Sequence, residues 1–136
     1  MKTLKTEKIK FEGQDREYDI VSKDDPDVVG APRWFVSYGQ GLPFISDEVP
    51  EQYRQHIIFH ELYEFEKIPN DRMGRCRETL VKELERVPAG EIREYIRFRR
   101  EVFEELKRYA EKINVPELGR EVSGSLEYLI NLDNTK

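Results

Sequence analysis

The sequence predicts an α+β fold in which a short antiparallel sheet of about four strands is followed by three main helices. Residues 1–48 hold short runs of alternating apolar and polar residues, separated by glycine and proline turns. Residues 50–113 hold longer runs with apolar residues at helical spacing. With 136 residues in all, the chain is long enough to bury a core as one domain. We therefore expect a single domain over residues 1–136.

The strands are predicted from four short segments. Residues 9–11 and 18–21 alternate around Gly13 and indicate a hairpin. The loop SKDDPDVVGAP separates them from RWFVSY and LPFIS, two further strands that the turn GQG joins at residues 39–41. These four segments make up the mainly β part, residues 1–48.

The helices are predicted from their start and stop signals. SDEVPEQY offers a cap residue, early acids and a proline, so a first helix is expected over residues 50–68. PND ends it, and a second helix follows over residues 71–87. After PAG we expect a long third helix over residues 91–113. Residues 114–136 are expected to be a loose C-terminal tail with one short helix near SLEYLINL.

The composition limits the classes of function. Charged residues make up 38% of the chain and the net charge is −5, which argues against general binding to nucleic acid or to an anionic membrane. No apolar run approaches the roughly 18 residues that span a bilayer, and the first residues lack a secretory pattern. The single cysteine excludes an intrachain disulfide. We therefore expect a cytoplasmic protein.

The segment RQHIIFHELYEFEKI carries the residues with the clearest chemical potential. On a helix, His56 and His60 lie one turn apart, as do His60 and Glu64, and either pair suits a metal ion. His56 and Glu64 are about 12 Å apart along the axis, so all three do not bind one ion easily. The alternative is that these side chains form the solvated face of an ordinary amphipathic helix.

FHELYEF resembles the active-site helix of the zincin metallopeptidases, whose motif is H-E-x-x-H. The resemblance covers residues 33–83, and the helix that follows directly is similar to the gluzincin pattern. It implies that His60 is a metal ligand and that Glu61 is the general base. Glu64 stands where the family has its second histidine, so the motif here is H-E-x-x-E. A carboxylate still binds zinc, but a harder, more anionic site also suits manganese or iron.

The resemblance implies a third ligand from the second helix. Glu83 lies on the shoulder of that helix's apolar stripe and is the better candidate, with Cys76 beside it as the alternative. Glu83 is equally well read as a surface acid, and Cys76 as a small core residue.

Arg99 is predicted to lie in the middle of the third helix's apolar seam. An arginine keeps its charge when buried and therefore needs an anionic partner. It could hold Glu61, Glu64 or Glu83, it could bind a substrate carboxylate or oxyanion, or it could form a purely structural salt bridge.

Two functions from different classes follow. The first is a small metal-dependent peptidase or amide hydrolase, with zinc or another divalent metal, that acts on a peptide or protein held along an edge strand near WFVSY or LPFIS. The second is a non-catalytic interaction domain on the same scaffold, with a degraded metal site or no metal. A third interpretation is an ordinary α+β accessory protein in which His56 and His60 are surface residues.

Overall fold

The computed structural model describes residues 1–39 and 42–135. The chain divides into two compact units, Met1–Lys67 and Ile68–Lys136, and each is described by itself. The expectation of one domain stays a prediction. The predicted GQG turn includes residues 40 and 41, which lie outside the described residues.

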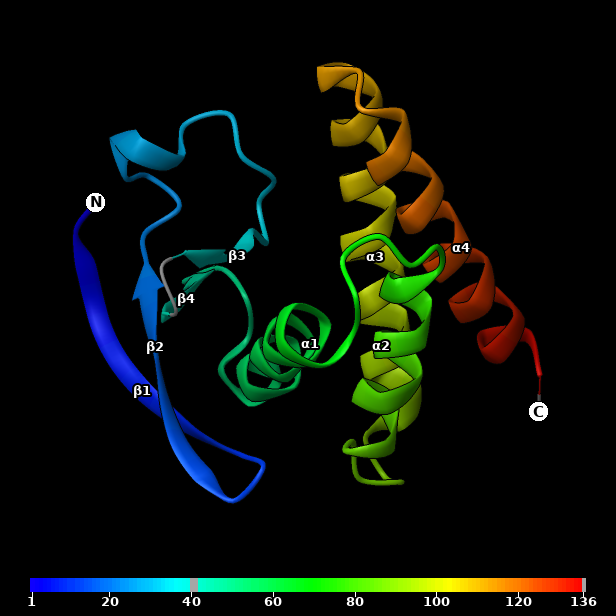
Figure 1. The fold of residues 1–136 in the computed structure, drawn as a ribbon, viewed down its shortest axis with the longest axis horizontal. Coiled ribbons are helices and arrows are strands. Elements are labelled where there is room, and N and C mark those ends of the chain that lie inside the picture. The colour runs from blue at the N-terminus through cyan, green and yellow to red at the C-terminus, as the bar shows by residue number, and fades with distance from the viewer. Residues whose placement is uncertain (40–41, 136) are drawn as a thin grey trace. The chain divides into compact units, whose positions relative to one another are not determined.

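The first unit is built on a four-stranded sheet with the order β1-β2-β4-β3 (Figure 1). The strands are β1 Thr3–Phe11, β2 Gln14–Val21, β3 Val36–Gly39 and β4 Leu42–Ser46. The pairs β1–β2 and β3–β4 are antiparallel, whereas β2–β4 is parallel. The α+β class is therefore confirmed, but the sheet is mixed rather than wholly antiparallel. After β2, a long connection with a short 3-10 helix at Pro26–Val28 leads to β3 at the edge of the sheet. Strand β4 then pairs with β2 in parallel.

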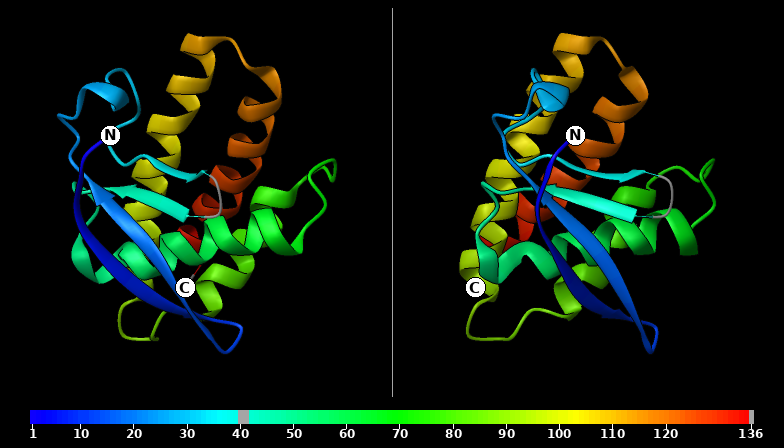
Figure 2. Two further views of the ribbon diagram at one scale, coloured as in Figure 1. Left: turned by 60° about the vertical axis from the view of Figure 1, so that its left-hand side comes forward. Right: turned by 90° about the vertical axis from the view of Figure 1, so that its left-hand side faces the viewer.

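The predicted hairpin is confirmed as β1 and β2, which form a long curved ribbon in Figure 2. Its turn is Glu12–Gly13, with φ of 51° and 81°, the double positive φ that a two-residue hairpin favours. Ile9, Tyr18 and Ile20 are buried on the alternation that the sequence predicts. Strand β3, which begins within the segment WFVSY, lies at an edge of the sheet, whereas β4 is internal.

Helix α1, Arg54–Lys67, packs on β1, β3 and β4 and confirms the predicted first helix. A single 3-10 turn, Glu51–Tyr53, leads into it. Ile57, Ile58 and Leu62 are fully buried. Aromatic pairs complete the contact with the sheet, with the Phe11 and Phe59 ring centroids 5.7 Å apart and the stacked Tyr38 and Phe65 rings 5.3 Å apart. The sheet thus fixes which side chains of α1 face inward.

The second unit consists of α2 Arg75–Glu85, α3 Ile92–Ile113 and α4 Pro116–Asn134. Helices α3 and α4 form an antiparallel hairpin, and α2 packs against α4 (Figure 1). Their common core consists of Cys76, Leu80, Ile96, Phe103, Val122, Leu126 and Leu129. None of the helices in the described part of the chain is long and apolar enough to cross a membrane.

The expectation of a loose C-terminal tail is wrong. Helix α4 has 19 residues, with Pro116 in its first turn, where a missing N–H is harmless. Val122, Leu126 and Leu129 recur at helical spacing and are buried in the core of the second unit. Gly119 and Gly124 interrupt the sequence pattern and weaken helix propensity, but packing of this apolar face outweighs that loss.

Candidate functional site

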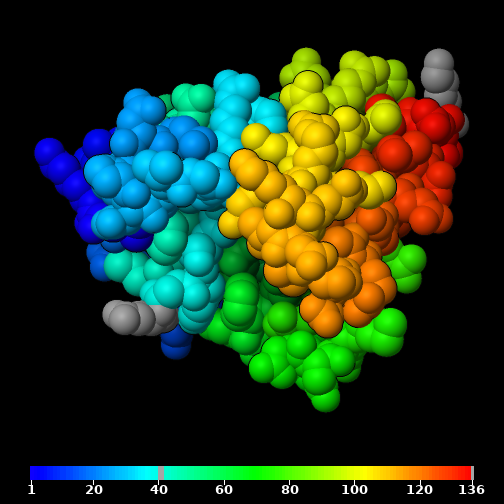
Figure 3. Space-filling view, turned by 90° about the horizontal axis from the view of Figure 1, so that it is seen from above, coloured from blue at the N-terminus to red at the C-terminus, as the bar shows by residue number. Residues whose placement is uncertain are grey.

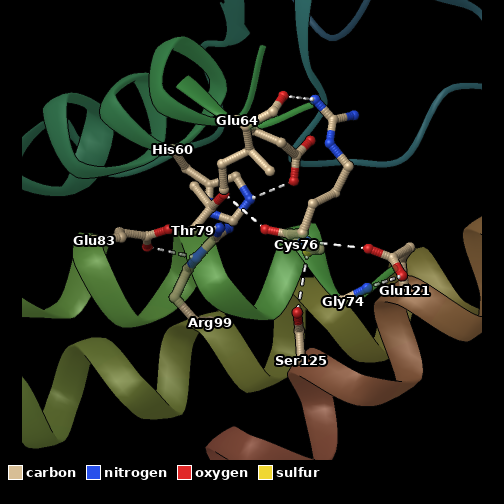
Figure 4. Close-up of polar contacts among 11 residues, drawn as sticks. His60, Glu64, Gly74, Cys76, Thr79, Glu83, Arg99, Glu121 and Ser125 are labelled. Carbon is tan, nitrogen blue, oxygen red and sulfur yellow. Dashed lines mark hydrogen bonds and ion pairs between the residues drawn. The ribbon is translucent and has the colours of Figure 1, made fainter. Parts of the chain in front are cut away.

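Helix α1 brings His60 and Glu64 together. His60 is buried, with 4% of the residue exposed. The Nε2 atom of His60 lies 3.3 Å from Oε2 of Glu64, one turn further along the helix, as Figure 4 shows. This one-turn convergence is what the sequence spacing predicts.

The distance between these two atoms matches a metal site. Zinc binds histidine nitrogen and carboxylate oxygen at about 2.0–2.2 Å, so two ligands of a tetrahedral ion are separated by about 3.4 Å. The same separation also fits a weak hydrogen bond or ion pair, since a protonated imidazole can donate to a carboxylate. The distance between the two atoms thus suits two ligands of one metal ion as well as a hydrogen-bonded pair.

The other candidates on α1 have different surroundings. Glu61 follows His60 directly and is partly buried. His56 lies one turn nearer the start of α1 and is also partly buried. Among the described residues of ligand type, His60 and Glu64 of the first unit could take part in holding a metal ion, and Cys76 is a residue of the same type in the second unit. His56 and Glu83 are not among these three residues.

Glu83 is fully buried in the second unit and bonded to side chains of α3. Arg99 meets it with two nitrogens, Nη2 at 3.1 Å from Oε1 and Nε at 2.9 Å from Oε2. The phenol of Tyr95 donates a further hydrogen bond to Oε2. Arg99 is 3% exposed, and its guanidinium lies 4.6 Å from the Phe103 ring centroid. Glu83, one of the partners predicted for Arg99, is thus the carboxylate that contacts its guanidinium.

This buried cluster shifts the ionisation of its members. Burial is the largest single influence on the pKa of Arg99 and lowers it, but the electrostatic influence of Glu83 and Tyr95 and the hydrogen bond with Glu83 together outweigh burial, so the net pKa is raised. Burial, followed by the charge of Glu83, raises the pKa of Tyr95 well above its usual range. Arg99 therefore stays cationic and Tyr95 neutral. Because both oxygens of Glu83 are bonded to these groups, a metal bound there would have to break the bridge.

Cys76 lies in the first turn of α2. The hydroxyl of Ser125 donates to its sulfur at 3.0 Å. Glu121 accepts the backbone N–H of Cys76 at 3.1 Å and that of Gly74 at 2.8 Å (Figure 4). A carboxylate at a helix N-terminus satisfies amides that lack intrahelical partners and complements the helix dipole. Glu121 and Ser125 thus fix the thiol and its helix start.

Sequence reasoning missed Glu121 and Ser125 because both belong to α4, which was read as a tail. The signal that finds them is the proline start followed by Leu118, Val122 and Leu129 at helical spacing. That phase places Glu121 and Ser125 on or beside the buried face of the helix.

Comparison of the chain with protein-family models, curated proteins and solved structures found no match. The resemblance to the zincins accordingly stays a prediction from the sequence of residues 33–83.

Proposed function

We propose that the chain binds a divalent metal ion through His60 and Glu64 and hydrolyses a peptide or amide bond with it. The observation that carries the proposal is the 3.3 Å separation of His60 Nε2 and Glu64 Oε2 on a helix whose imidazole is buried. Burial favours a defined ligand over a mobile surface side chain. Zinc suits this pair best, while manganese and iron suit the carboxylate.

The metal would supply Lewis acidity, which makes a water molecule more acidic and polarises a carbonyl. Glu61 is proposed to accept a proton from water as the oxygen forms a bond to the carbonyl carbon. The carbon–nitrogen bond then breaks, and Glu61 returns the proton to the leaving amine. The resemblance of FHELYEF to H-E-x-x-H supports this role for Glu61.

The substrate proposed is an extended peptide segment. Strand β3 lies at the edge of the sheet, and an edge strand can pair with a peptide through its backbone. Among the roles predicted for Arg99, its contacts favour the structural salt bridge, since Glu83 holds its guanidinium.

The identity of a third protein ligand stays a prediction. Within the second unit the contacts favour Cys76, because Glu83 already holds Arg99 and Tyr95. A thiolate would also shift the preference from manganese towards zinc.

The test is metal content per purified chain, measured by elemental analysis. We expect a stoichiometric ion that is lost in His60→Ala and in Glu64→Ala and kept in His56→Ala, the matched control on the same helix. Cys76→Ser and Glu83→Gln separate the two candidates for the third ligand. Metal-free protein whose stability ignores both zinc and chelator would overturn the proposal.

A non-catalytic interaction domain is the second candidate, favoured by Glu64 in the place of the family's histidine. Glu61→Gln distinguishes the two functions. For an enzyme, this variant keeps its metal and loses hydrolysis of a peptide library. If the wild-type chain binds metal but, like Glu61→Gln, cleaves no peptide of the library, the non-catalytic function is the correct one.

A further inference from the structure

The outward face of α4 has a feature that the packing of the second unit does not explain. Gly119 and Gly124 lie inside this helix, where glycine weakens helix formation relative to alanine. A Cβ added at either position would meet nothing within 4 Å. Neither glycine is therefore required by a close contact among the described residues.

The two glycines line a shallow hollow of about 530 Å³ beside α3 and α4. Figure 3 shows the side of the molecule on which the α3–α4 connection lies, with the start of α4 in orange. Ser123 and Gly124 line it on α4, with Arg120 and Glu127 one turn to either side, and the charged residues of α3 that line it are Lys107 and Glu111. Small side chains between two opposite charges allow a second helix to approach closely.

We propose that this face binds the same face of a second copy of the chain, with the two α4 helices antiparallel. A two-fold axis between Ser123 and Gly124 places Arg120 of one copy opposite Glu127 of the other, because the two residues are equally far from that axis along the sequence. The same operation repeats the pair with the copies exchanged. The charges are thus self-complementary.

The helix phase agrees with this arrangement. At about 100° per residue, Arg120, Ser123, Gly124 and Glu127 fall within a sector of about 100°, opposite the buried Val122 and Leu129. Arg120 and Glu127 are exposed, and no described residue forms an ion pair with either one. The smallest side chains therefore lie at the crossing point, where two helix backbones approach most closely, and the charges lie at its ends.

The test is the mass of the wild-type protein by sedimentation equilibrium over a wide range of concentration, with low and high salt. We expect a concentration-dependent dimer that weakens with salt. Arg120→Glu and Glu127→Arg each place like charges opposite one another in both symmetric pairs, and each should weaken dimerisation about tenfold or more. The double variant Arg120→Glu/Glu127→Arg restores the opposite signs and should recover the dimer.

Gly124→Leu is the steric test. Leucine favours the helix and meets open space within the chain, so the variant should keep its fold by circular dichroism and lose the dimer. A wild-type chain that stays monomeric at every concentration overturns the proposal, and so does a dimer that ignores the charge exchange. In the first case the face contacts solvent or a different protein. Because the readout is mass rather than metal or hydrolysis, this test is independent of the proposed function.

Discussion

Each unit pairs an acidic side chain with a buried basic one, but the two pairs differ in what neutralises the acid. In the second unit, Glu83 meets Arg99, a cation that does not titrate in the accessible pH range. In the first unit, Glu64 lies against His60, an imidazole that can be either cationic or neutral. The pair in the second unit is neutralised by a cation that is always charged, whereas the imidazole of the pair in the first unit can be neutral.

This difference separates a structural pair from a candidate ligand pair. A neutral imidazole offers a lone pair to a metal, which a guanidinium never does. Burial of Glu83 and Arg99 is balanced by two nitrogen–oxygen contacts and the Tyr95 phenol. Burial alone therefore does not indicate function. The chemical type of the basic partner decides whether the pair could bind a metal ion.

The largest effect is expected from Arg99→Met, which leaves the charge of Glu83 buried without its cation. We expect the free energy of unfolding to fall by about 3–5 kcal/mol, measured with urea. Glu83→Gln in the same chain removes that charge and keeps an acceptor for Tyr95, so the double variant should recover much of the loss. A decrease below about 1 kcal/mol for Arg99→Met would show that water or another group neutralises Glu83.

The next effect concerns the pair in the first unit. Zinc at about a hundredfold excess over its dissociation constant should stabilise the wild-type protein by about 2.7 kcal/mol. His60→Ala and Glu64→Ala should each abolish the difference between melting with zinc and melting with chelator, while His56→Ala should retain it. Equal stabilisation of all four proteins would mean that zinc binds elsewhere.

Tyr95 provides a third test, in which the pH dependence of stability probes the buried pair of the second unit. Tyr95→Phe removes a hydrogen bond to a charged acceptor and should destabilise the protein by about 2 kcal/mol at neutral pH. Because its folded pKa is raised, the neutral phenol is favoured by folding. The stability it contributes is full below the unfolded pKa of about 10 and is lost as pH rises above that value. Urea titrations from about pH 8 to about pH 11 should therefore show stability falling less steeply for Tyr95→Phe than for the wild-type protein, and equal slopes would contradict the raised pKa of Tyr95.

How much of this the sequence predicts depends on whether the interaction is local. The turn between β1 and β2 and the pairing of His60 with Glu64 follow from spacing within a few residues, and both were predicted. The phase of α3 placed Arg99 among apolar residues, which is why an anionic partner could be expected. Glu83 was among the partners predicted because α2 also has a clear phase.

The rest depends on contacts between distant parts of the chain. Parallel pairing of β2 with β4 depends on the path of a long loop, which leaves no periodic signal. Helix α4 is stabilised by burial of Val122, Leu126 and Leu129, while its two glycines lower the local propensity. Glu121 caps α2 from 45 positions away, so its role appears only when the fold is known.

The smallest effect is expected from a second ion pair of the first unit, near the surface. Arg16 meets both oxygens of Glu66, at 2.9 Å and 2.6 Å, and the Tyr38 phenol donates to the same carboxylate. The hydrogen bond from Arg16 is the main cause of the lowered pKa of Glu66. Folding therefore favours the carboxylate, and the stability it contributes is present above the usual pKa of about 4.5 and lost as pH falls below it.

Arg16→Gln should accordingly lower the free energy of unfolding by about 1 kcal/mol at neutral pH, a value that solvent screening keeps small. The difference from wild type should shrink towards zero as Glu66 becomes protonated in acid. Lys10→Gln, which removes a fully exposed pair with Asp15 on the same hairpin, is the matched control and should change nothing measurable. If Arg16→Gln loses the same stability at every pH, the packing of its side chain rather than its charge joins β2 to α1.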